Sequence, residues 1–193
     1  MRKLFYINCI SFGIVSLLQV IQIGTLTRAT SLEIFGDIVK IQLLVTSIFE
    51  ICDCRSWELL GIFSRENHYS TNTVMRQLLC LDLISGLISV LLIACFSRYF
   101  LSEWPIDYSY ALGTFTLLTF FGSFDQLFLQ KLRLQGREVP LNIIKIGSAA
   151  MTLLFLACLV YLEQVSIQTY LSMIGLARIF AMVLTIFQLK NNS

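Results

Sequence analysis

Six apolar segments, each long enough to cross a lipid bilayer, follow one another along the chain with short polar connections between them. A helix needs about 20 apolar residues to cross the hydrocarbon core. The segments are residues 4–26, 34–62, 77–98, 108–130, 141–162 and 167–189. The sequence therefore predicts an all-α integral membrane bundle of six transmembrane helices that forms one domain over residues 1–193.

The composition agrees with a membrane protein and excludes several other classes. Apolar residues make up 56% of the chain and charged residues only 13%, whereas about a quarter of a soluble domain is charged. A net charge of +2, without a basic run interleaved with aromatic residues, argues against a nucleic-acid partner. The six cysteines are scattered through apolar segments, which predicts packing or lipid-facing residues rather than disulfides or metal ligands.

The first segment and the basic residues set the expected topology. The apolar run continues to Leu26, contains Asn8, Gln19 and Gln22, and is followed by no small-residue cleavage pattern, so we expect a retained helix rather than a signal peptide. Lysine and arginine favour the cytoplasmic side, which predicts that both termini are cytoplasmic. The cytoplasmic ends would then carry Arg2, Lys3, Arg65, Arg76, Lys131, Arg133, Arg137, Lys145 and Lys190, against Arg28, Lys40 and Arg98 on the opposite side.

The segment 34–62 is unusual because it contains several ionisable residues. Among them are Lys40, Glu50, Asp53, Arg55 and Glu58. On a helical wheel, a polar arc holds Thr46, Ser47, Glu50, Asp53, Cys54 and Trp57, and the apolar residues fall largely elsewhere. A charge inside the membrane costs a few kcal/mol on insertion scales, so this arc should face the interior of the bundle. Two interpretations stay open: a buried structural ion pair of Asp53 or Glu58 with Arg55 or with an arginine on another helix, or a solvated pathway.

The other segments carry weaker polar faces. The first has Asn8, Ser11, Gln19 and Gln22, the third has Asp82, Ser85, Gly86 and Ser89, and the fourth has Thr119, Gly122, Ser123, Asp125, Gln126 and Gln130. Small and hydroxyl residues serve helix packing in lipid, but Asp82, Asp125 and Arg178 indicate a cavity in the bundle.

Four local patterns resemble the O-antigen flippase type of polysaccharide exporter, which belongs to the multidrug and oligosaccharidyl-lipid exporter superfamily. The run TRATSLEIFGDI places Glu33 five residues and Gly36 eight residues after Arg28. The run CDCRSWELLGIF, residues 52–63, resembles the end of the family's second helix, and LLCLDLISGLISVLL resembles its third. The basic stretch LQKLRLQGREVPLNIIK resembles the link between its fourth and fifth helices.

The resemblance implies a function and a set of site residues. Such exporters have twelve to fourteen helices in two lobes, so six helices correspond to the amino-terminal lobe alone, which would need a second lobe or a second copy of the chain. They move a lipid-linked oligosaccharide across the bacterial inner membrane by alternating access, in the biosynthesis of lipopolysaccharide and other polysaccharides. Arg28, Arg55 and Arg178 would bind the pyrophosphate, and Glu50, Asp53, Glu58, Asp82 and Asp125 would form ion pairs or bind a coupling ion.

Two alternative functions follow from the same residues. The chain could be a non-transporting membrane subunit or a remnant in a polysaccharide assembly complex, or, with less support, an enzyme acting on a lipid phosphate. There is no phosphate-binding glycine loop and no metal-ligand spacing, and the one histidine, His68, lies in a polar connection. We therefore expect no enzyme activity, no cofactor and no bound metal.

Overall fold

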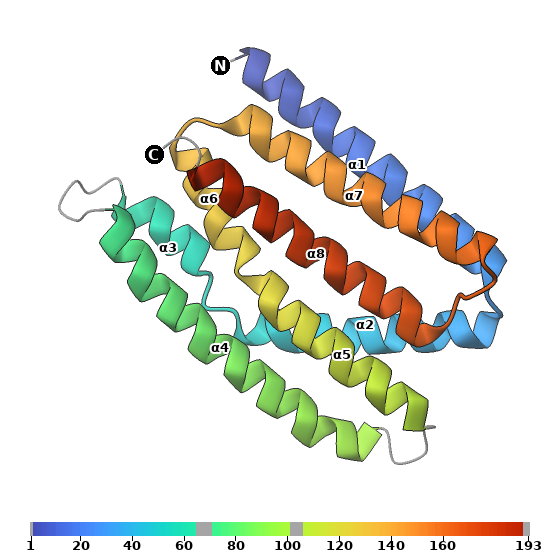
Figure 1. The fold of residues 1–193 in the computed structure, drawn as a ribbon. Helices are drawn as coiled ribbons and strands as arrows, with labels where there is room; N and C mark the ends of the chain where they lie inside the picture. The colour runs from blue at the N-terminus through green and yellow to red at the C-terminus, as the bar shows by residue number, and fades with distance from the viewer. Residues whose placement is uncertain (1, 65–70, 101–105, 191–193) are drawn as a thin grey trace.

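The computed structural model describes residues 2–64, 71–100 and 106–190, and this part of the chain is an all-α bundle without strands (Figure 1). The helices are α1 (Arg2–Ala29), α2 (Leu32–Cys52), α3 (Ser56–Phe63), α4 (Thr71–Phe100), α5 (Ile106–Ser123), α6 (Asp125–Leu134), α7 (Glu138–Tyr161) and α8 (Ile167–Lys190). Five helical stretches, which involve α1, α4, α5 with α6, α7 and α8, are long and apolar enough to cross a membrane. The predicted all-α membrane bundle is thereby confirmed.

The predicted helix over residues 34–62 is not continuous. It divides into α2 and α3 at Asp53, Cys54 and Arg55, which are not helical. Arg55 has a φ of 46° in the left-handed region. The backbone N–H of Arg55 donates a hydrogen bond to the Asp53 carboxylate at 2.9 Å. Aspartate and cysteine are weak helix formers, and this side-chain bond replaces a helical backbone bond. The segment predicted to be the second crossing is therefore a broken helix, and it is not among the five stretches that are long and apolar enough to span a membrane.

The fourth predicted segment is also interrupted. α5 ends at Ser123, Phe124 forms a turn, and α6 continues through residues expected to belong to a basic loop. α6 ends in a Schellman motif, in which the N–H of Gly136 donates to the carbonyl of Arg133 and the N–H of Arg137 donates to that of Leu132. Gly136 has a φ of 71°, which only glycine adopts without strain.

The centre of the bundle is formed by α2, α5 and α8. Ile38 and Ile41 of α2, Phe115 of α5 and Leu171 of α8 are fully buried there. α5 and α8 approach closely because Gly175 has no side chain, and its backbone lies against the Leu118 side chain. A second apolar cluster, which includes Leu60, Leu78 and Leu127, fixes α3 against α4 and α6. The two broken helices are thus held together on both sides of their breaks.

The outer faces of the bundle are apolar and exposed, as in a protein surrounded by lipid. Phe12 of α1 is 75% exposed, and Leu91 of α4 and Leu154 of α7 are exposed as well. The six cysteines are free in the structure, and all of them except Cys52 are exposed.

α1 packs along α7, and α1 and α2 meet only near Ser31, which caps α2 by accepting a hydrogen bond from the N–H of Ile34 at 3.3 Å. From there the two helices diverge towards the end of the bundle that carries both termini (Figure 1). The structure does not test the predicted orientation in the membrane. The side chains of Arg2, Lys3 and Arg98, and the residues Arg65 and His68, lie outside the part of the chain that it describes.

Candidate functional site

A cavity of about 310 Å³ lies where the two broken helices face each other. Its walls come from the end of α2, the start of α3, the middle of α4, the α5–α6 junction and α8. The lining residues are Thr46, Phe49, Glu50, Asp53, Ser56, Trp57, Asp82, Ser85, Gly86, Thr119, Gly122, Ser123, Asp125, Gln126 and Arg178. We call this space the central cavity.

The polar arc predicted for the second segment does face the interior. Thr46, Glu50, Asp53 and Trp57 line the central cavity, whereas Ile51, on the other side of α2, is 81% exposed. Ser47 and Cys54, which were assigned to the same arc, are not in the lining. The helix break accounts for Cys54, because the residues that follow it no longer keep the periodicity of α2.

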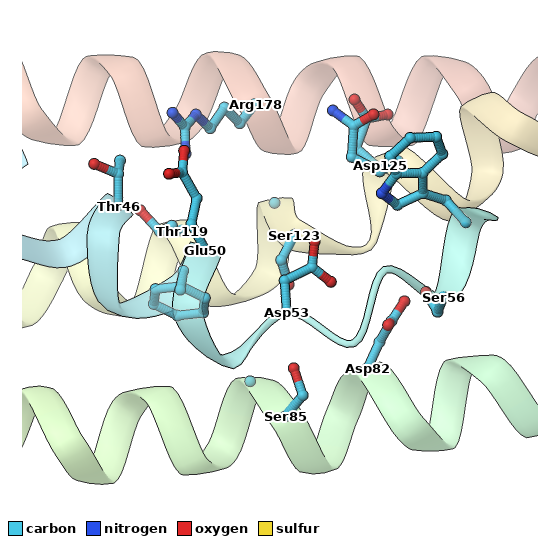
Figure 2. A pocket seen from close by; sticks show the side chains of 15 residues that line it. Thr46, Glu50, Asp53, Ser56, Asp82, Ser85, Thr119, Ser123, Asp125 and Arg178 are labelled. Carbon is cyan, nitrogen blue, oxygen red and sulfur yellow. The ribbon is translucent and has the colours of Figure 1, made fainter. Parts of the chain in front are cut away.

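Acidic residues from four elements surround the central cavity. Glu50 comes from α2, Asp53 from the break, Asp82 from α4 and Asp125 from the start of α6. Figure 2 shows Asp82 extending from α4 towards Ser56, with which it interacts, and Asp53 beside Ser123. The hydroxyl of Thr185 on α8 donates a hydrogen bond to the Asp125 carboxylate at 3.2 Å. Asp125 is therefore held by α8, and Asp82 is buried beside Ser56 of α3.

Arg178 is the basic residue of the central cavity. It extends from α8, and its side chain and that of Glu50 point towards one another (Figure 2). Its charge interacts with those of Asp125 and Glu50, although among the described residues no carboxylate lies within ion-pair distance of it. A Cβ on Gly122 of α5 would lie 3.0 Å from the Arg178 Cβ. The glycine therefore leaves room for the arginine to pass along α5 into the cavity.

Three predicted site residues lie elsewhere. Arg28, in the last turn of α1, lines a separate pocket on the outer side of the bundle with Gly24 and Val160. Arg55 and Glu58 form an ion pair at 3.3 Å, with both side chains largely exposed. An ion pair thus forms in this segment, but it is exposed and not buried as expected. Lys40 likewise pairs with Asp37 at 2.9 Å.

The structure adds two basic residues that the sequence did not mark as site residues. Lys145 lines two further cavities, of about 470 and 720 Å³, and Arg133 lines the larger of them. The smaller one is also lined by Asp125, Gln126 and Arg178 and therefore lies next to the central cavity, with these three residues between the two. The sequence held no signal for this arrangement beyond the basic stretch itself, because α6 and α7 bring the residues together only in the folded bundle.

The larger cavity ends at a polar cluster between α1 and α7. The Asn8 side-chain amide donates to the Glu138 carboxylate at 2.7 Å, and that of Asn142 donates to the Asn8 carbonyl oxygen at 2.6 Å. The cluster lies near the start of α1 and of α7, at the end of the bundle that carries both termini. A row of three neighbouring cavities therefore extends from this end past Lys145 to Arg178 and the central cavity, and we call this row the polar groove.

The chemistry of these residues is that of binding. Among the described residues, no three histidine, cysteine, aspartate or glutamate side chains gather closely enough to hold a metal ion. The central cavity offers carboxylates, hydroxyls, one guanidinium and the rings of Phe49 and Trp57, a combination suited to a polar organic molecule. Comparisons of this chain with protein-family models, with curated proteins and with solved structures found no match.

Proposed function

We propose that this chain is one lobe of a membrane transporter that moves a lipid-linked oligosaccharide across the bilayer by alternating access. The observation that carries the proposal is the polar groove. The central cavity and the cavity of about 470 Å³ share Asp125, Gln126 and Arg178, and that cavity shares Lys145 with the largest one, within helices long enough to span a membrane. Ionisable groups are costly at this depth and mark pathways for polar substrates in membrane proteins. Broken helices at the centre of a bundle are likewise typical of substrate sites in transporters.

The basic residues along the groove suit the anionic part of such a substrate. Arg133, Lys145 and Arg178 follow one another from the end that carries the termini to the middle of the bundle. Arginine binds phosphate oxygens with two parallel N–H groups, and lysine binds them as a point charge. A pyrophosphate that enters from this end would meet each of these cations in turn, while its lipid tail stays in the bilayer.

The shape of the polar groove also supports the proposal that this lobe works with a second lobe or a second copy of the chain. α1 and α2 diverge towards the end where a pyrophosphate would enter (Figure 1), and Gln19 and Gln42 line the cavity between them. Glutamine side chains left open to acyl chains would lack hydrogen-bond partners. A second lobe, or a second copy of this chain, would close the groove and could rock against this lobe to open it on alternate sides.

The test is translocation of a fluorescent polyprenyl-pyrophosphate oligosaccharide in proteoliposomes that contain the purified chain. We expect transport above that of empty vesicles, and a loss of about tenfold or more in Arg178→Ala, because one charged hydrogen bond to phosphate contributes about 1.5–3 kcal/mol. Arg76→Ala is the matched control, since Arg76 is exposed on α4 and lines none of the three cavities. Wild-type protein that moves no more lipid than empty vesicles would favour the non-transporting membrane subunit instead.

A further inference from the structure

The central cavity has more negative than positive side chains. Four carboxylates line it, those of Glu50, Asp53, Asp82 and Asp125, against the single guanidinium of Arg178 among the described lining residues. Arg55 does not correct this excess, because it is exposed and pairs with Glu58 outside the cavity. Charges inside a membrane protein interact strongly, because little water screens them. A bound ligand that carries a positive charge would offset the excess.

An unpartnered hydroxyl in the same cavity points independently to a ligand. Thr119 of α5 is 4% exposed, yet its Oγ1 has no hydrogen-bond partner among the described residues. Figure 2 shows it near Thr46 and Glu50, on the wall of the cavity. A buried polar group without a partner costs about 1–3 kcal/mol and is rare in folded proteins. A ligand group that donates to or accepts from this hydroxyl would remove that cost.

The form of the cavity indicates the kind of cation. Its carboxylates come from four separate elements and surround a space of about 310 Å³, which is the volume of roughly ten water molecules. Among the described residues they do not gather into a metal-binding group. The rings of Phe49 and Trp57 lie in the same wall, and aromatic faces attract organic cations. These features fit an ammonium group attached to a polar ring better than a bare metal ion.

We propose that the central cavity binds a sugar unit with a free, protonated amino group, with Asp53 and Asp82 as its carboxylate partners. The inference rests on the proposed transport function and specifies the headgroup: an amino sugar near the helix breaks, with the phosphate part at Lys145 and Arg133. Asp53 and Asp82 are chosen because Glu50 and Asp125 already face Arg178. The charge of Asp53 acts directly on that of Asp82, so one ammonium would neutralise part of both.

The test uses the fluorescence of Trp57. The chain has two tryptophans, so the variant Trp104→Phe leaves Trp57, in the cavity wall, as the only one. Glucosamine, N-acetylglucosamine and glucose are titrated into this purified variant at about pH 6, where a primary amine is protonated, with sodium chloride at equal ionic strength as the inorganic cation. We expect a saturable change with glucosamine, and at least about tenfold weaker effects from the other three probes, because they lack the organic ammonium.

Asp53→Asn and Asp82→Asn should each weaken glucosamine binding about tenfold, and Thr119→Val should weaken it less. Glu58→Gln, which removes a carboxylate outside the cavity, should leave it unchanged. Thr119→Val also keeps the test decisive if a carboxylate variant fails to fold. Equal responses to the three sugars, an equal response to sodium chloride, or no saturable response would each overturn the amino-sugar inference. Transport of a neutral lipid-linked sugar that is sensitive to Arg178→Ala would still leave the proposed function standing.

Discussion

The close packing of α5 against α8 makes a specific prediction for Gly175. A Cβ at this position would lie 2.7 Å from the Leu118 Cδ1 and 3.1 Å from its Cγ, and closer still to its Cβ. The Leu118 Cβ is fixed to the backbone of α5 and cannot rotate away, so Gly175→Ala must push the two helices apart. Such overpacking costs about 1–3 kcal/mol, whereas alanine gains about 1 kcal/mol over glycine in a helix.

The matched control is Gly113→Ala on α5, where a Cβ would meet nothing within 4 Å. Both variants share the gain in helix propensity, so the difference between them isolates the overlap with Leu118. For a chain of this size, 1 kcal/mol corresponds to about 2–4 °C in Tm. We therefore expect Gly175→Ala to unfold about 2–12 °C below Gly113→Ala when thermal unfolding is followed by circular dichroism in detergent. Equal midpoints for the two variants would refute the α5–α8 packing.

Two further predictions concern stability and use the same unfolding measurement. Glu163 has a φ of 52° in the turn after α7, where its N–H donates to the carbonyl of Val160. Glu163→Gly should stabilise the chain by about 1 kcal/mol, because glycine adopts this left-handed conformation without strain. A lower Tm would contradict the conformation of this turn. Asn8→Ala should destabilise it by about 0.6–2 kcal/mol, because it removes two hydrogen bonds between α1 and α7. Cys9→Ala, one residue further along α1 on an exposed position, is its control and should leave Tm nearly unchanged.

The position of Arg178 illustrates what a single helix can predict. Its place within an apolar segment required it to face the interior, since a charge towards lipid is costly, and it does line the cavity. Arg28 and Arg55 also carry the resemblance to exporters, yet one lies in a separate pocket and the other in an exposed ion pair. Arg55 also lies within an apolar segment, so residue type and spacing alone did not separate it from Arg178.

The break in the second segment could not be predicted from the sequence pattern either. Neither glycine nor proline marks Asp53 to Arg55, and the residues on both sides continue an apolar run. The break is maintained by the Asp53 bond to the Arg55 N–H and by the packing of Leu60 against α4 and α6. The ionisable residues in this segment were the available signal, because charges within a membrane helix often accompany unwound backbone.

The amino-acid sequence by itself determined the class of this protein and the inner face of most helices. Both follow from local physics, since apolar length sets a membrane crossing and the helical period places polar residues on one side. Only the tertiary structure decided where the helices break, which arginine enters the central cavity, and that Lys145 and Arg133 extend the groove. These depend on contacts between residues far apart in the chain, as between Asp125 and Thr185, and no local pattern encodes them.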